Sequence, residues 1–239
     1  MGKLLKYEFR KTRNLKLVII VLACLFEAVL LVGMRPGSLI RGDRTVVIGT
    51  MGLFFTAGIG MAIIAIYSTV ILYRDLNTRQ SYMLFLTPHS SWEILGAKFI
   101  ENLVSFFVMG LFFLLLALLD MRMAMKYIPD LSFSVLINSI DPDSLQFSDI
   151  AGALLYGVLE MLAWVLAAFN AVIIQAALFN GKKYGGWLAF LLFIVIAYLQ
   201  VWMSAELVTS FASGIALASV WAAGLYALGG WIMQEKLSV

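Results

Sequence analysis

Four polar side chains lie inside long apolar stretches of this sequence, where their chemistry differs from that of their neighbours. Glu27 lies near the middle of one apolar block, and Glu160 lies near the middle of another, which also contains Asn170 and Gln175. A charge near the middle of a membrane-spanning helix costs about 2.5–3.5 kcal/mol on insertion scales, so such a residue usually faces inward, is paired or is protonated. These residues are candidates for a translocation path or for a site that binds a cationic group. Interhelical hydrogen bonding, worth about 0.6 kcal/mol on average, is the alternative explanation.

The residue counts exclude several other kinds of site. Cys24 is the single cysteine and His89 the single histidine, so the sequence predicts neither an internal disulfide nor a histidine-rich metal site. The phosphate-binding motif G-x-x-x-x-G-K-[ST] does not occur, and the nearest fragment, at residues 181–183, lacks the upstream glycine and the hydroxyl that such a loop requires. We therefore expect no metal, no cofactor and no catalytic residue in this chain.

The composition is that of an integral membrane protein. Of the 239 residues, 62% are apolar and 13% are charged, whereas a soluble domain has roughly 45–50% apolar and about 25% charged residues. The apolar residues form six blocks, each long enough to cross a hydrocarbon layer about 30 Å thick as a helix. The sequence predicts an all-α, polytopic fold with an amphipathic helix over residues 1–16 and a transmembrane domain over 17–239, whose spans cover residues 17–34, 46–73, 99–119, 150–178, 187–208 and 211–233.

Lys and Arg are distributed unevenly around these six spans. Twelve of the 17 lie in the N-terminal segment, the second-to-third and fourth-to-fifth connections and the C-terminal tail, and five lie in the other connections. Cytoplasmic loops carry the excess of Lys and Arg, so the side with twelve is predicted to be cytoplasmic. Because six is an even number, both termini are expected on that side. The expected location is the cell membrane, as a multi-pass protein.

The segment before the first span carries a basic stripe. Lys3, Lys6, Arg10 and Arg13 recur at i, i+3, i+7 and i+10, which places them on one face of a helix. Such a helix is expected to lie flat on an anionic cytoplasmic leaflet, where each cation contributes about 1 kcal/mol of attraction. A basic flank that only orients the first span is the alternative.

Small residues gather in two of the spans and are expected to form packing faces: Gly49, Gly52, Gly58, Gly60 and Ala62 in the second, and Gly214, Ala218, Ala222 and Gly224 in the sixth. Gly58 and Ala62 lie four residues apart in the second span, and Gly214, Ala218 and Ala222 repeat that spacing in the sixth. Small residues at this spacing let two helix backbones approach closely within lipid. These faces serve either the packing of the chain's own bundle or a seam between two copies.

The connection between the second and third spans carries the signals for a short cytoplasmic helix. Pro88 is expected to end any helix that arrives from the second span, and Ser90-x-x-Glu93 forms a capping box that starts a new helix. Trp92 and Ile94 would then form an apolar knob at the membrane surface. An amphipathic turn of this kind fits a groove in a partner, and a buried Trp is a frequent anchor in such contacts.

This connection resembles the membrane subunits of ABC transporters, specifically the small six-span permeases of the exporter type. The family pattern Leu-Thr-Pro-x-Ser-x-x-x-Ile-Leu-x-x-Lys is similar to residues 86–98, which read Leu-Thr-Pro-His-Ser-Ser-Trp-Glu-Ile-Leu-Gly-Ala-Lys, and residues 6–11 resemble the family's N-terminal elbow helix. After the second span the family often has acidic residues and a glycine, where this chain has Asn-Thr-Arg-Gln-Ser at residues 77–81. This difference leaves the detailed docking surface open.

The resemblance implies a division of labour between this chain and separate subunits. In the family the turn after the proline is a coupling helix that lies in a cleft of an ATP-hydrolysing subunit. Here that role would fall to Pro88, His89, Ser90, Ser91, Trp92, Glu93 and Ile94. The implied partners are two such subunits, with ATP and Mg²⁺, a second permease chain, identical or related, and the lipid of a bacterial cell membrane, without nucleic acid. A capped surface turn without a partner is the alternative.

The function expected from this resemblance is the export of an amphiphilic compound by alternating access, driven by ATP hydrolysis in the partner subunits. A peptide antibiotic, a drug-like compound and a lipid are the candidate cargoes. One alternative is a proton-coupled secondary transporter with Glu27 and Glu160 as proton carriers, although the six spans show no obvious inverted repeat with broken helices. The other is a membrane scaffold or sensor that transports nothing.

Overall fold

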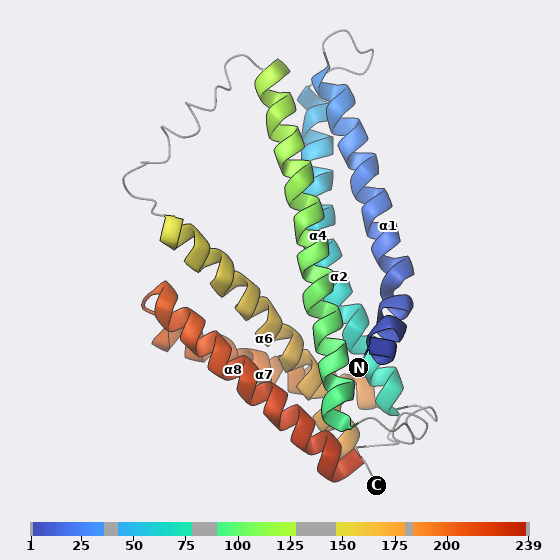
Figure 1. Cartoon of the computed structure of the whole chain (residues 1–239), viewed down its shortest axis with the longest axis vertical. Helices are drawn as coiled ribbons and strands as arrows, with labels where there is room; N and C mark the ends of the chain where they lie inside the picture. The colour runs from blue at the N-terminus through green and yellow to red at the C-terminus, as the bar shows by residue number, and fades with distance from the viewer. Residues whose placement is uncertain (1, 36–42, 78–89, 128–146, 180–183, 238–239) are drawn as a thin grey trace. The chain divides into compact units, whose positions relative to one another are not determined.

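The computed structural model describes residues 2–35, 43–77, 90–127, 147–179 and 184–237, and within these ranges the chain is helical (Figure 1). The long helices are α1 (Gly2–Met34), α2 (Asp43–Asn77), α4 (Ser91–Tyr127), α6 (Phe147–Phe179), α7 (Gly185–Leu207) and α8 (Phe211–Ile232), and a short π-helical segment, η1 (Met233–Leu237), follows α8. All six long helices are apolar enough and long enough to cross a membrane. The predicted all-α fold with six membrane-spanning helices is confirmed.

Several helices are longer than the predicted spans. The N-terminal segment and the first span form one helix, α1, and α4 begins at Ser91, eight residues before the predicted start of the third span at residue 99. The four prolines, at positions 36, 88, 129 and 142, all lie outside the described residues. Because no proline interrupts a described helix, nothing in the sequence ends these helices at the edge of the apolar blocks.

The chain divides into two compact units. The α6–α8 unit comprises Met1–Glu8, Ile66–Glu101 and Gln146–Val239, and the α1–α4 unit comprises Phe9–Ala65 and Asn102–Leu145. The helices α1, α2 and α4 each contribute one end to the first of these units and the remainder to the second.

The α1–α4 unit is held together by close packing between α1 and α2. Glycines of α2 lie against side chains of α1, with Gly49 at Leu30, Gly52 at Phe26 and Gly60 at Ile19. Ile19 also belongs to a buried cluster with residues of α2 and α4, namely Ile64 and Met109. The predicted pair Gly58 and Ala62 is exposed, and a methyl group at Gly58 would meet nothing within 4 Å. Internal packing therefore uses a neighbouring set of small residues on the same helix.

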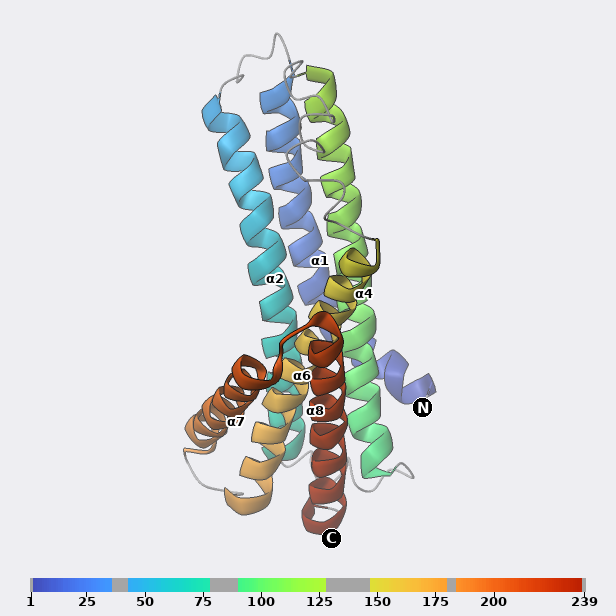
Figure 2. The same cartoon turned by 90° about the vertical axis from the view of Figure 1, so that its left-hand side faces the viewer.

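In the α6–α8 unit the helix α6 lies between α7 and α8 (Figure 2). Of its most hydrophobic 18-residue window, 67% is buried, whereas the corresponding windows of the other five helices are 33% buried or less. The core of this unit contains Leu166 and Ala167 of α6 and Leu225 of α8. The small residues Gly214 and Ala218, predicted as a packing face, are buried. The helix α6 therefore forms the centre of this unit.

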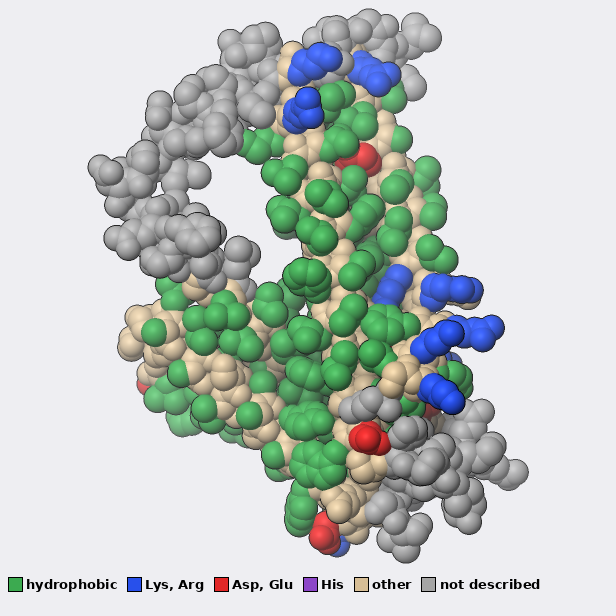
Figure 3. Space-filling model, viewed as in Figure 1, with side chains coloured by type: hydrophobic (Ala, Val, Ile, Leu, Met, Phe, Trp, Pro, Cys, Tyr) green, Lys and Arg blue, Asp and Glu red, His purple; other side chains and the backbone are tan. Residues whose placement is uncertain are grey.

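On the face shown in Figure 3, the side chains of the α1–α4 unit are mainly hydrophobic between two groups of basic side chains. On α1 the charged residues Lys16 and Arg35 flank a stretch in which Glu27 is the single ionisable residue apart from Cys24. These 18 residues of helix correspond to about 27 Å, which matches a hydrocarbon layer of about 30 Å. The pattern is that of a helix that crosses a bilayer once.

We predict that Gly49→Ala destabilises the protein, because the new Cβ would lie 2.8 Å from the Leu30 backbone N and Cα atoms, which belong to α1 and have no room to move. Overpacking of this kind costs about 1–3 kcal/mol. The matched control is Gly58→Ala on the same helix, where the added methyl group meets open space. Thermal unfolding of the detergent-solubilised protein, followed by tryptophan fluorescence, should show a lower Tm for the first variant alone. Equal Tm values for the two variants would contradict the packing described here.

Candidate functional site

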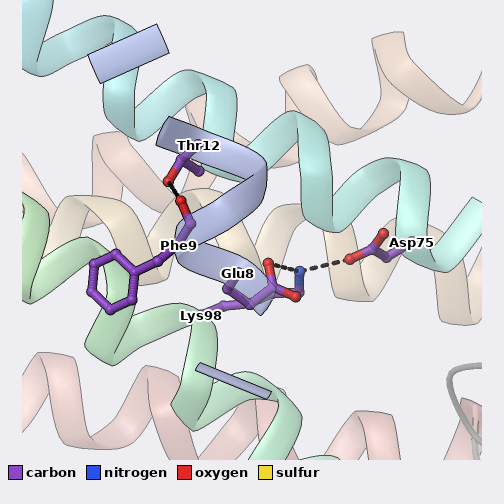
Figure 4. A network of polar contacts seen from close by, with 5 residues as sticks. All are labelled: Glu8, Phe9, Thr12, Asp75 and Lys98. Atoms are coloured by element: carbon purple, nitrogen blue, oxygen red, sulfur yellow. Dashed lines mark hydrogen bonds and ion pairs between the residues drawn. The ribbon is translucent and has the colours of Figure 1, made fainter. Parts of the chain in front are cut away.

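A buried lysine joins three helix ends in the α6–α8 unit. The Lys98 Nζ atom of α4 lies 3.1 Å from Glu8 Oε2 of α1 and 2.6 Å from Asp75 Oδ2 of α2 (Figure 4). Lys98 is 2% exposed and Glu8 is 5% exposed, so the charges are removed from solvent. We call these three residues the Lys98 cluster. Removing one partner from a buried ion pair typically costs about 3–5 kcal/mol, so the cluster resists separation of the three helices.

The amphipathic pattern at the start of α1 explains how Glu8 reaches this position. The basic residues Lys3, Lys6, Arg10 and Arg13 are all exposed, as the predicted stripe requires. Glu8 and Thr12 lie one turn apart on the opposite face, and both are buried. The Thr12 hydroxyl donates to the Phe9 carbonyl at 3.4 Å (Figure 4). The start of α1 therefore has an exposed basic face and a buried polar face.

The first turn of α4 is capped as predicted. Ser90 Oγ accepts a hydrogen bond from the Glu93 backbone N–H at 3.2 Å, which is the N-cap contact of the expected capping box. Pro88 and His89 lie outside the described residues. The helix that starts here continues to Tyr127, so within the described residues the predicted coupling turn and the third span belong to one helix.

The prediction that Trp92 and Ile94 project as an apolar knob is wrong. Ile94 is 1% exposed, and the Trp92 indole packs against α8 so closely that a methyl group at Gly230 would overlap it. Trp92 Nε1 donates to Gln234 Oε1 at 2.8 Å, and the Tyr226 hydroxyl donates to the Trp92 carbonyl at 3.1 Å. These contacts show that the first turn of α4, which begins at Ser91, packs into the α6–α8 unit.

A chain of polar side chains connects α6, α7 and α8. Trp221 Nε1 of α8 donates to Gln200 Oε1 of α7 at 3.1 Å, and Gln200 Nε2 donates to Glu160 Oε1 of α6 at 2.9 Å. Trp164 Nε1, one turn after Glu160, donates to the same oxygen at 3.2 Å. Glu160 and Gln200 line a small recess, together with Met203, Ser204, Leu217, Ala218 and Trp221. We call this the Glu160 recess.

The other candidates for the translocation path lie elsewhere. Asn170 is fully buried, and its Nδ2 atom donates to the Leu166 carbonyl at 2.9 Å and to the Leu225 carbonyl of α8 at 2.8 Å. Gln175 is 1% exposed and lies against Gly185 at the start of α7. Neither residue lines the Glu160 recess. Asn170 joins α6 to α8, as the hydrogen-bonding explanation expects.

Glu27 belongs to the α1–α4 unit and has a different environment from Glu160. It is 7% exposed, and neither of its carboxyl oxygens has a hydrogen-bond partner in the described part of the chain. The Asp120 carboxyl group of α4 lies close enough to interact with it electrostatically. Asp120 Oδ1 is also buried without a hydrogen-bond partner among the described residues. Two acidic residues therefore lie close together inside this unit.

Some residues of these sites were not predicted from the sequence. Lys98 belongs to the segment that resembles the permease family, but its partners Glu8 and Asp75 were not predicted. Trp164 and Trp221 were not predicted as partners of the Glu160 and Gln200 network. The signal for Glu8 was available, because it is an acidic residue on the face opposite the basic stripe. Among the described residues, no three His, Cys, Asp or Glu side chains are placed to hold a metal ion.

Comparisons with known proteins identify no relative. No protein-family model matches the chain, and no curated protein and no solved structure matches it either. The assignment of a function therefore depends on the residues and contacts described above.

We predict that Lys98→Met destabilises the protein, because it leaves the Glu8 and Asp75 carboxylates buried without their cation. A loss of about 3–5 kcal/mol is expected for a broken buried pair, which corresponds to a fall in Tm of roughly 10 °C for a chain of this size. Lys3→Met, at an exposed position of the basic stripe, is the control and should leave Tm unchanged. Adding Glu8→Gln and Asp75→Asn to Lys98→Met should restore much of the loss. A triple variant less stable than Lys98→Met would show that the charges do not act as a cluster.

Proposed function

We propose that this chain is the membrane subunit of an ATP-driven exporter of the ABC type, and that it moves an amphiphilic compound with energy from separate ATP-hydrolysing subunits. Three features support the proposal. The chain has six helices able to cross a membrane, its sequence has no phosphate-binding motif, and residues 86–98 resemble the family's coupling segment.

The Lys98 cluster is the observation that carries the proposal. Lys98 is the last residue of the segment that resembles the coupling element, and it joins the ends of α1, α2 and α4 by buried ion pairs. A partner that pushes on the start of α4 would therefore displace three helix ends together. This is the mechanical link that a transporter without its own ATPase site requires.

The contacts of Trp92 extend this link to a fourth helix. The Trp92 side chain binds Gln234 in η1, just beyond the C-terminal end of α8. The Trp92 carbonyl group binds Tyr226, which lies in the last two turns of α8. In the other direction α4 continues without interruption to Tyr127. Movement applied near Ser90 would thus be transmitted along α4 and into α8 as a rigid-body displacement, the kind of motion that alternating access uses.

The remaining parts of the proposal concern the assembly. Two ATP-hydrolysing subunits, with ATP and Mg²⁺, would act on a pair of permease chains, identical or related, in a bacterial cell membrane. The coupling surface would include the exposed Ser90 at the start of α4 and the preceding residues Pro88 and His89. The cargo would enter from the membrane, because its amphiphilic character favours the lipid phase.

Site-specific cross-linking tests the coupling role. In a Cys24→Ser background, Ser90→Cys should cross-link in native membranes to a subunit that mass spectrometry identifies as an ATPase with a phosphate-binding loop. Thr209→Cys, at an exposed position in the connection between α7 and α8, is the matched control and should give no such product, because it belongs to the side predicted to face outward. An ATPase product from Thr209→Cys, or none from Ser90→Cys, would contradict the proposal.

Proton-coupled transport is the second candidate, and the contact between Glu27 and Asp120 favours it specifically. Carboxyl groups buried in a membrane protein are typical of proton relays, and among the described residues no cation forms an ion pair with either member of this pair. The discriminating measurement is uptake driven by a proton gradient in vesicles that contain the purified chain alone. The second candidate predicts uptake that Glu27→Gln abolishes, and the ATP-driven exporter predicts none.

A further inference from the structure

The carboxyl group of Glu160 has no cationic partner within its own bundle of helices. The helices α6, α7 and α8 contain no Lys, Arg or His. The groups that bind Glu160 are the neutral N–H donors of Trp164 and Gln200. An acidic residue within a membrane-spanning helix usually pairs with a cation or lines a path for one. The structure thus leaves a place for a cation that comes from outside the bundle.

The hydrogen bonds fix which oxygen of Glu160 is free for such a cation. The Trp221 indole can only donate, so the Gln200 oxygen faces Trp221 and the Gln200 amino group faces Glu160. Both Gln200 and Trp164 donate to Oε1. Among the described residues no group donates to Oε2, and this oxygen is not one of the fully buried polar atoms. Oε2 is therefore the acceptor that remains for a ligand.

The lining of the recess suits a small cation with N–H donors. Ser204 contributes a hydroxyl group that can accept a hydrogen bond, and Trp221 contributes an aromatic ring, to which cations are attracted. Met203 and Leu217 make the rest of the lining apolar. A carboxylate oxygen, a hydroxyl group and an aromatic ring together satisfy an ammonium group, which has three donors.

The need for N–H donors decides between kinds of cation. A primary ammonium group offers three N–H donors, which a carboxylate oxygen and a hydroxyl group can accept. A trimethylammonium group has no N–H to donate. The recess therefore favours a primary ammonium over a quaternary one.

The position of the recess indicates that its ligand comes from the membrane. Gln200 lies seven residues before the end of α7, which is about 10 Å along the helix. Val201 on α7 and Val220 on α8, each next in sequence to a residue that lines the recess, have exposed apolar side chains. An alkyl chain attached to the ammonium group would find a hydrophobic surface beside the recess.

We propose that the Glu160 recess binds the primary ammonium group of an amphiphilic molecule, with Glu160 as the ion-pair partner. Gln200 and Trp221 act as positioning residues, because their hydrogen bonds hold Oε1 of the carboxylate and leave Oε2 as the free acceptor. This inference rests on the proposed export function only in naming the cargo class, a primary amine carried on an apolar chain. Binding itself requires no ATPase.

Thiol protection on the purified full-length chain tests the inference. The reporter is Met203→Cys in a Cys24→Ser background, with the protein in nanodiscs and N-ethylmaleimide as the label. Dodecylammonium at ten times its Kd should slow labelling about elevenfold, because the rate of labelling is proportional to the fraction of recesses that hold no amine. Butylammonium should protect the thiol only at higher concentrations, because its alkyl chain is too short to partition strongly into lipid. Thr209→Cys, exposed and outside the recess, reports unspecific effects of the amine and should label at an unchanged rate.

Two comparisons can overturn the inference. Protection by dodecyltrimethylammonium as strong as that by dodecylammonium would exclude a primary-ammonium site, and this comparison needs no change at Glu160. Protection by dodecylammonium that persists in Glu160→Gln would exclude the ion pair. Glu206→Gln is the control for loss of a carboxylate, and protection should persist in it. If Ser90→Cys still cross-links to an ATPase when protection fails, this inference alone is wrong. If dodecylammonium protects the thiol but no ATPase partner is found, the binding site is supported and the proposed ATP-driven export is contradicted.

Discussion

The ion pairs of Lys98 are the interaction on which the arrangement of helix ends depends. Helices in a membrane gain no hydrophobic free energy from association with one another, so packing and polar contacts must fix their positions. Lys98 is nearly inaccessible, and its Nζ atom binds carboxylates from two other helices at 3.1 and 2.6 Å. Three helix ends are thereby fixed at one point, at the last residue of the segment that resembles a coupling element.

The two charged sites of the α6–α8 unit differ in how their charge is compensated. In the Lys98 cluster a cation and two carboxylates belong to the chain itself, which suits a structural joint. At Glu160 the carboxylate is held by two neutral donors on one oxygen, and no basic residue occurs on α6, α7 or α8. A site that lacks its own cation suits transient binding, because a ligand can supply the missing charge and take it away again.

Much of the fold followed from the sequence, because helices in a bilayer must satisfy their backbone internally and cover its thickness. Six spans, the exposed basic stripe on α1 and the Ser90 cap were predicted correctly. The lengths of the helices were not, since the helix that the Ser90 cap starts runs on through the predicted third span to Tyr127 as α4. The burial of Ile94 and the partners of Lys98 and Glu160 depend on contacts between residues distant in sequence, which periodicity along one helix does not reveal.

The most direct measurement of the central claim, that this chain is driven by a separate ATPase, is purification of the tagged chain from its native membrane in a mild detergent. Mass spectrometry of the intact complex should find an ATP-hydrolysing subunit in a one-to-one ratio with this chain, together with ATPase activity that a transported amine stimulates. Recovery of the chain without any nucleotide-binding partner, together with proton-driven uptake by the chain alone, would contradict the account.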